Sequence, residues 1–368
     1  MKNTDNLTLA TYLPEQFSEH FLHFCQCILL LILFQPFFLF AAGPGTTSSN
    51  FLKIPIGARQ TALGSAFTAV SDDATAIYYN PAGLAQLRKP EINFTQNRYF
   101  EGISQSWLGG IYPIKKPSNG AFGFALNYLS VSAFDAYDGE DNKIGSVSAR
   151  SLAAYFSYAR ALNLGGKHIS AFFCGANLKY IKERLASEKA SGFALDLGLM
   201  AKVEGIENLK FAVMAENIAS NEIRFIDKGY RLPFNLKFGS SYKLSGKDKG
   251  YRVNFSLDFN FPQDNHDYVA AGIESGFNDV FTFRAGYNSF GDLSNGINLG
   301  FGIEAGKYLG RDIGINYSFG DSYDFGNIHK VDITYKFEKN RVAPEYSSSP
   351  ENAPLRESIY EEPTEQPY

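Results

Sequence analysis

The fold is decided by the stretch from Arg252 to Phe261, which reads Arg-Val-Asn-Phe-Ser-Leu-Asp-Phe-Asn-Phe. Polar and apolar residues alternate one by one along it. Successive side chains of an extended strand point to opposite faces, so this strand would have one apolar and one polar face. An amphipathic helix would instead need apolar residues three or four positions apart. The stretch therefore predicts a β-strand with Leu257 on its apolar face and Asp258 on its polar face.

The same alternation recurs over residues 91–338, and it is clear in Phe281–Tyr287, Ile297–Ile303 and Val331–Phe337. Most of the predicted strands have about 9–13 residues, which is enough to cross a bilayer at a tilt. We predict about 14 strands in this region. Their expected starts lie near Glu91, Ser104, Asn119, Arg150, His168, Ser191, Asn208, Leu232, Tyr251, His266, Phe281, Ser294, Leu309 and Ile328.

The connections between these strands alternate in length. Lys115–Ser118 and Ser245–Lys249 are short, whereas Ser132–Ala149 and Asn217–Arg231 are long. Short turns at one rim and long loops at the other are typical of membrane barrels, and an even strand number places both chain ends at the short-turn, periplasmic rim. A soluble β-sandwich or lipocalin-like barrel is the competing interpretation, but it would leave very large polar sheets. The prediction is an all-β transmembrane antiparallel β-barrel.

The composition agrees with a barrel. Aromatic residues make up 15% of the 368 residues, which suits strands and membrane-interface girdles. The mean hydropathy of -0.19 is too low for a bundle of membrane-spanning helices, whereas every second residue of a barrel strand faces the lumen. The net charge of -4 provides no basic face, so we expect no nucleic-acid partner.

The N-terminal stretch has the pattern of an export signal. No charged residue occurs between Glu19 and Lys53, and the apolar run Ile28–Phe40 ends at the small residues Ala41-Ala42. Such a run followed by small residues predicts a cleaved signal peptide over residues 1–42. The alternative is an uncleaved anchor helix, which the shortness of the run disfavours.

Cysteine usage offers little chemistry. Cys25 and Cys27 lie in the predicted signal peptide, so only Cys174 would remain after cleavage. One cysteine can form neither an intrachain disulfide nor a cysteine-based metal site.

Residues 43–90 do not follow the strand pattern and are rich in Gly and Ala. A chain of this length buries too little surface to be stable alone. It is also too apolar to remain in water, with Phe51, Leu63 and Phe67 among its residues. The barrel lumen would supply the missing partner surface, so we predict an N-terminal hatch that plugs the lumen.

Part of this segment resembles a known family. Phe51–Ala85 is similar to the N-terminal signature of PorV/PorQ-type proteins, which belong with the FadL-like (long-chain fatty acid transporter) outer-membrane barrels. The matching residues are Gly57-Ala58-Arg59, Leu63-Gly64, Ala66–Val70, Asp72–Ala76 and Asn80–Ala85. The resemblance implies a 14-stranded barrel with an N-terminal hatch, and it selects as the candidate site the hatch motif Gly57, Arg59, Gly64, Asp72, Asp73, Asn80, Pro81, Ala82 and Gly83.

Catalytic and metal-binding patterns are weak in this chain. A Ser-His-Asn lipase site would lack the Gly-x-Ser-x-Gly elbow. The acidic stretch Asp135–Asn142 lacks the spacing of a calcium loop, and Gly300–Gly306 misses the dinucleotide-binding spacing. The pair Asp72-Asp73 could bind a cation, although hydrogen bonds within the hatch are favoured. We therefore predict no enzyme, no catalytic residue, no cofactor and no metal site.

The C-terminal residues 339–368 are rich in Glu and Pro, a composition that predicts a disordered acidic tail. This tail is either an idle extension or a periplasmic docking peptide. It follows Phe337, although outer-membrane barrels commonly end at such an aromatic residue.

Two functions follow from the barrel and the resemblance. In the first, the protein passes hydrophobic small molecules across the bacterial outer membrane, with the hatch rearranging to open a path. In the second, it is a PorV-type secretion accessory that shuttles or anchors exported proteins at the cell surface. The expected partners are outer-membrane lipid, the outer-membrane insertion machinery, and either a hydrophobic small molecule or an exported protein.

Overall fold

The structure is a computed structural model that describes residues 45–99, 102–114, 119–162, 169–204, 206, 208–219, 222–245, 250–289, 296–306, 312–322 and 326–337. The predicted signal peptide, the predicted tail and the expected strand starts at His168, Ser294 and Leu309 lie outside the described residues. The domain boundaries drawn from the sequence stay predictions.

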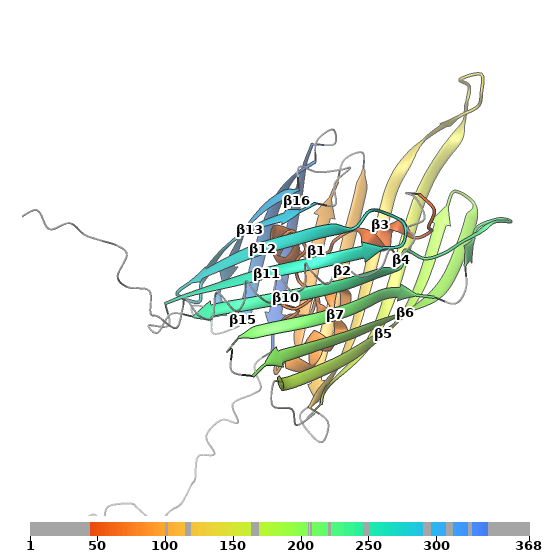
Figure 1. Ribbon diagram of the computed structural model, residues 1–368. Helices are drawn as coiled ribbons and strands as arrows, with labels where there is room; N and C mark the ends of the chain where they lie inside the picture. Colours follow the sequence, from red (N-terminus) through yellow and green to blue (C-terminus); the bar gives the residue numbers. More distant parts are fainter. Residues whose placement is uncertain are drawn as a thin grey trace, which may run out of the picture.

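Fourteen antiparallel strands form one closed barrel, in the order β1-β16-β15-β14-β13-β12-β11-β10-β7-β6-β5-β4-β3-β2 (Figure 1). Their bounds are β1 Glu91–Arg98, β2 Ile103–Ile114, β3 Gly120–Tyr137, β4 Lys143–Leu162, β5 Ile169–Leu185, β6 Glu188–Val203, β7 Leu209–Ile218, β10 Asn235–Ser245, β11 Tyr251–Pro262, β12 Tyr268–Phe277, β13 Phe281–Asn288, β14 Ile297–Glu304, β15 Asp312–Ser322 and β16 Gly326–Lys336. A separate two-stranded sheet joins β8 Ile223–Arg224 to β9 Gly229–Tyr230. The barrel closes where Glu91 of β1 pairs with Lys336 of β16. The predicted all-β antiparallel barrel is confirmed.

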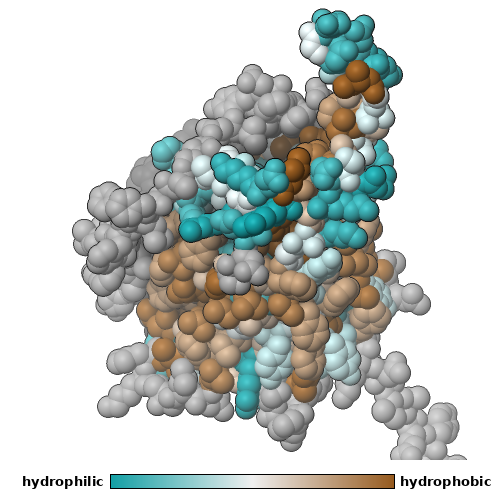
Figure 2. Space-filling model, turned by 90° about the vertical axis from the view of Figure 1, so that its right-hand side faces the viewer, coloured by the Kyte–Doolittle hydropathy of each residue, from teal (hydrophilic) through white to brown (hydrophobic). Residues whose placement is uncertain are grey.

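The alternation read from the sequence sorts side chains between lipid and lumen. Asp258 is buried in the lumen, whereas Leu257 lies on the outer face of β11. Outward-facing apolar side chains continue around the wall, for example Phe124, Phe156 and Leu178, which lie in register on β3, β4 and β5 and are all exposed. Figure 2 shows the resulting apolar band, with hydrophilic side chains above it. A band of this kind is what a lipid bilayer requires of a barrel wall.

The longest hairpin differs from the prediction. Ser132–Ala149 was expected to be a loop, but β3 continues to Tyr137 and β4 begins at Lys143. The loop prediction was wrong because pairing above the membrane needs no apolar outer face, and the two strands continue past a register shift between Val131 and Phe134. Only a turn remains, in which the Asp138 carboxylate accepts hydrogen bonds from the backbone N–H groups of Glu140 and Asn142. The hairpin projects beyond the rest of the barrel (Figure 1).

The segment before β1 occupies the lumen. It contains η1 (Asn50–Lys53), α2 (Ala58–Ala62), α3 (Ala76–Tyr79) and η2 (Pro81–Gln86). Its large apolar side chains are almost completely buried and pack with lumen-facing wall residues such as Trp107 and Tyr155. Among the described residues, no helix has the length and apolar character needed to span a membrane.

The hatch crosses the lumen from one rim to the other. The backbone N–H of Ser48 donates to the carbonyl of Arg231, in a connection at the long-loop rim. The segment then descends to Glu91, which lies with Lys336 at the short-turn rim. The prediction that both chain ends lie at the short-turn rim is therefore right for the two ends of the barrel and wrong for the start of the hatch, because an even strand number constrains only the strands.

Candidate functional site: the hatch, its two anchors and the cavities beside it

A cluster of charged side chains, buried except for the partly exposed Asp72, fastens one side of the hatch. Arg59 of α2 forms ion pairs with Asp72 at 2.7 Å, Asp73 at 2.9 Å and Glu274 of β12 at 2.8 Å. Glu274 also pairs with Arg284 of β13 at 2.7 Å. We call these five residues the ionic anchor. Its two guanidinium groups face three carboxylates, and charges removed from water need such partners.

Protonation in the hatch part of the ionic anchor follows from these contacts. Burial alone would raise the pKa of Asp72, but the cationic Arg59 and Lys210 outweigh burial and hold this pKa below its usual value. Burial alone would lower the pKa of Arg59, but the Asp72 and Glu274 carboxylates raise it well above its usual value. Both groups are therefore charged at neutral pH, and the ion pair persists.

Two wall carboxylates bind the backbone of the hatch. Asp332 of β16 accepts hydrogen bonds from the N–H groups of Ala58 at 2.7 Å and Arg59 at 3.1 Å. Asp258 of β11 accepts from Phe67 and Thr68, both at 2.9 Å. Buried backbone N–H groups must find an acceptor, and an ionised one makes the stronger bond.

Close packing fastens the other side of the hatch. Asn80 caps η2 through the N–H of Ala82 at 3.0 Å, and its amide donates to the Leu199 carbonyl of β6 at 3.2 Å. The wall offers glycine at the contact: a Cβ on Gly198 would lie 2.1 Å from Asn80 Oδ1, and one on Gly175 would lie 2.4 Å from the Pro81 carbonyl carbon. We call Asn80, Pro81, Gly175 and Gly198 the packing anchor.

The remaining motif residues shape the hatch itself. Gly57 precedes α2 with φ +76°, and Gly64 has φ +63° with its Cα held against the backbone of Tyr287. A Cβ on Gly83 would lie 2.2 Å from the Ser71 carbonyl oxygen, and Ala82 is fully buried. Small residues dominate the motif because the hatch touches backbone at these points.

Asp73 is bonded inside the hatch. Its carboxylate accepts from Gln60 Nε2 at 2.8 Å and from the Thr75 N–H at 2.9 Å, besides pairing with Arg59. Over the described ranges, no group of three or more His, Cys, Asp or Glu residues could hold a metal ion. These contacts agree with the interpretation favoured from the sequence, in which the acidic pair forms hydrogen bonds within the hatch.

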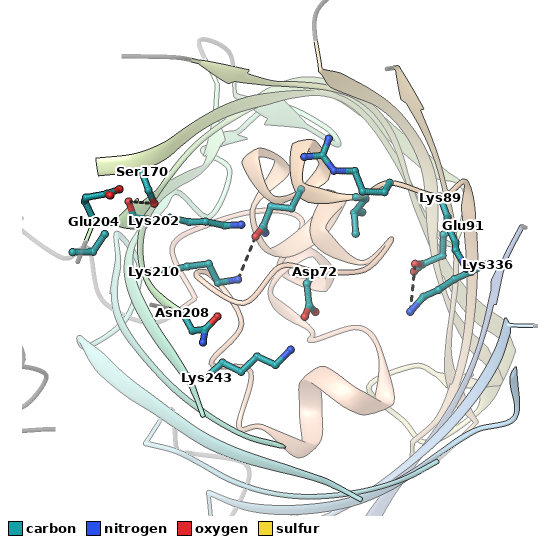
Figure 3. A pocket seen from close by; sticks show the side chains of 14 residues that line it. Asp72, Lys89, Glu91, Ser170, Lys202, Glu204, Asn208, Lys210, Lys243 and Lys336 are labelled. Carbon is teal, nitrogen blue, oxygen red and sulfur yellow. Dashed lines mark hydrogen bonds and ion pairs between the residues drawn. The ribbon is translucent and has the colours of Figure 1, made fainter. Parts of the chain in front are cut away.

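Cavities lie on both sides of the hatch. At the short-turn rim, a cavity of about 800 Å³ is lined by Lys202, Lys210, Lys243 and Lys336, with Asp72 of the hatch between them (Figure 3). At the long-loop rim, a cavity of about 700 Å³ is lined by apolar residues, including Ile218, Leu232 and Phe234, and by polar ones, including Arg231. A pocket of about 40 Å³ beside Tyr78 and Tyr268 adjoins the latter cavity, and Asn217 lines both.

The sequence motif located only the hatch half of this site. Glu274, Arg284, Asp258 and Asp332 come from four different wall strands, and no local motif joins them. The sequence could have pointed to these four residues, because each is a charged residue at a lumen-facing position within a strand. Glycines at lumen-facing strand positions, such as Gly198, could likewise have indicated where the hatch contacts the wall.

The comparisons with known proteins concern the fold. A family model described as an uncharacterised protein family (UPF0164) matches residues 41–194. No curated protein matches the chain. Among solved structures, the chain is similar to the CymD monoaromatic hydrocarbon channel, at 12% identity with 77% of this chain and 98% of that chain covered and a TM-score of 0.52.

Two further structures have the same level of similarity. The Ralstonia pickettii toluene transporter TbuX has 12% identity, covers 77% of this chain and 98% of its own, and gives a TM-score of 0.52. The Pseudomonas putida toluene transporter TodX has 13% identity, with 80% and 98% covered and a TM-score of 0.51. These likenesses confirm the prediction of a β-barrel of the outer-membrane type. The PorV/PorQ assignment stays a prediction.

Proposed function

We propose that this protein passes hydrophobic small molecules across the outer membrane. One observation carries the proposal: the hatch lies between a cavity at each rim of the barrel, and the cavity at the long-loop rim has Ile218, Leu232 and Phe234 in its lining. The solved barrels of similar fold include a monoaromatic hydrocarbon channel and toluene transporters, which supports the same class of substrate here. No catalytic step forms part of the proposal.

The position of the cavities suggests a route of passage. A hydrophobic molecule gains free energy where apolar surface is removed from water, so Ile218, Leu232 and Phe234 would favour entry at the long-loop rim. The next pocket, beside Tyr78 and Tyr268, is too small to hold such a molecule without movement of the hatch. Beyond the hatch, the cavity at the short-turn rim is lined by the apolar Leu87 and Val203 as well as by lysines, and a molecule that passes the hatch would leave the barrel through it.

The test is uptake of radiolabelled naphthalene by cells whose outer membranes contain the wild-type chain, compared with cells that lack it. We expect several-fold faster uptake of naphthalene and unchanged uptake of glucose. Phe234→Glu should abolish the gain because it places a carboxylate among the apolar residues, whereas Phe234→Leu should retain it. Equal naphthalene uptake with and without the protein would overturn the proposal.

A second candidate, the PorV-type secretion accessory, is favoured by one observation. The projecting β3–β4 hairpin exposes Phe134, Tyr137 and Ile144, with exposed fractions of 57%, 56% and 67%. Exposed apolar side chains beyond the membrane are typical of protein contact sites. Co-purification of exported proteins that share a C-terminal domain, lost on Phe134→Ser with Ile144→Ser, would support this role. Naphthalene uptake unaffected by the same substitutions would separate the two functions.

A further inference from the structure

Four basic residues gather on the outer face of the barrel near the long-loop rim. Arg150 of β4 pairs in register with Arg184 of β5, which pairs with Lys189 of β6. Lys182 lies on the same face of β5, two positions from Arg184. All four side chains are exposed. We call this group the basic row.

The basic row has no acidic partner among the described residues. None of its four members belongs to an ion pair described for the barrel, and the only described hydrogen bond from a side chain of the row goes from Arg184 Nε to the Ala186 carbonyl. The nearby Glu183 faces the lumen, where it bonds Ser49 and Ser151. Like charges directly opposite on neighbouring strands destabilise a sheet. An arrangement with Arg184 between two other cations therefore calls for an external anion.

The surroundings of the basic row indicate which anion. Directly below it on the same outer face lie Tyr180 and Phe193, whose ring centroids are 5.2 Å apart, and below these lies the apolar band that includes Phe156. Six positions separate Arg150 from Phe156, about 20 Å along a strand. Phe156 lies midway between Arg150 and Leu162, the short-turn end of β4, so we take it as the middle of the membrane-spanning part. At a tilt near 40° the distance from Phe156 to Arg150 is about 15 Å along the membrane normal, half of a hydrocarbon core of about 30 Å. The basic row therefore lies at the level of lipid headgroups.

We propose that Arg150, Lys182, Arg184 and Lys189 form a binding site for the phosphate group of a lipid in the outward-facing leaflet. The planar guanidinium groups of the two arginines can each donate two hydrogen bonds to phosphate oxygens, and the lysines add point charges. The lipid chains would lie against Tyr180, Phe193 and the apolar band beneath. Clusters of basic residues beside a membrane-spanning element recognise anionic lipids in this way.

The test uses the full-length barrel folded into phosphatidylcholine nanodiscs, with spin-labelled phosphatidic acid or spin-labelled phosphatidylcholine as the probe. Electron paramagnetic resonance gives the association constant of each lipid at the protein surface. We expect the wild type to prefer phosphatidic acid, with a loss of roughly fivefold in that preference for each basic residue removed. The triple variant Arg150→Gln, Arg184→Gln, Lys189→Gln should lose the preference and should still fold, because it removes like-charge repulsion.

Arg98→Gln is the matched control, since Arg98 is exposed on the outer face at the same rim of β1, on another side of the barrel. It should leave the preference within twofold, whereas Arg184→Gln alone should reduce it. Retention of the preference in the triple variant would overturn the proposal. Loss of the preference on addition of inorganic phosphate, at an ionic strength matched with sodium chloride, would identify a site for free anions and would overturn the assignment to lipid.

Discussion

The two anchors of the hatch hold it by different physics. On the side of β12 and β13, Arg59 enters a cluster of buried charges with Glu274 and Arg284. On the side of β5 and β6, Asn80 and Pro81 lie directly against backbone, where only the glycines Gly175 and Gly198 leave room. The ionic anchor depends on the charge state of each partner, whereas the packing anchor depends only on shape.

This difference indicates how the hatch could move. A buried charge that loses one partner leaves another charge uncompensated, so the ionic anchor holds or fails as a unit. Close packing is lost more gradually, because each contact contributes little by itself. We therefore expect the two anchors to respond separately to substitution. Four predictions test this comparison, from the largest expected effect to the smallest.

Deleting residues 46–86 removes both anchors together. The strands are untouched, so the barrel should still fold and show heat-modifiable mobility. Its conductance in planar bilayers should rise roughly tenfold or more, because a barrel of this strand number has interior space beyond what its own side chains fill. A deletion variant that folds but conducts no more than the wild type would show that the segment does not close the lumen.

Glu274→Gln breaks the ionic anchor alone. Removing one partner of a buried ion pair costs about 3–5 kcal/mol, and here it leaves Arg59 and Arg284 without their shared carboxylate. We expect frequent channel openings and faster hydrogen exchange at α2. Glu304→Gln is the control, because Glu304 lines a cavity at the same rim but lies outside the anchor. Equal behaviour of the two variants would contradict the role of the ionic anchor.

Gly198→Val disturbs the packing anchor alone. The new side chain would overlap Asn80, and overpacking of this kind costs typically 1–3 kcal/mol. Exchange protection should fall at η2 while α2 stays protected, the reverse of the pattern for Glu274→Gln. Gly110→Val serves as the control, since a Cβ on Gly110 would meet nothing closer than 3.8 Å. If both anchors loosen together in either variant, the hatch moves as one rigid body and the comparison fails.

Loss of the Asp72–Arg59 pair should have the smallest effect. The pKa of Asp72 is lowered, so its pairing with Arg59 stabilises the hatch at neutral pH and is lost only as the pH falls through the lowered value. The difference in conductance between Asp72→Asn and the wild type should therefore stay constant from pH 7 to the usual carboxyl pKa of about 3.9. Asp72→Asn should cost no more than about 1 kcal/mol, because the Asp72 side chain is partly exposed. If the difference in conductance between Asp72→Asn and the wild type shrinks between pH 7 and pH 5, this assignment is wrong.

The strand alternation from Glu91 to Phe337 determined the barrel by itself. When residues alternate with a period of two and one face is apolar, the face that each side chain takes is fixed. The sequence therefore showed that Leu257 points to the lipid and Asp258 to the lumen. The small residues around Asn80-Pro81 likewise marked the hatch, because only small side chains fit against backbone. The lipid-facing pattern ends at the membrane boundary, and for this reason it could not predict β3 and β4 beyond Val131.

The tertiary structure decided which wall residues meet the hatch. Glu274 and Asp332 stand far from Arg59 and Ala58 in the sequence, and only closure of the barrel brings them within hydrogen-bond distance. The same holds for the basic row, because Arg150, Arg184 and Lys189 become neighbours through strand register rather than through any local motif. A strand pattern specifies which face each side chain takes, whereas register and closure determine which side chains share a place on that face.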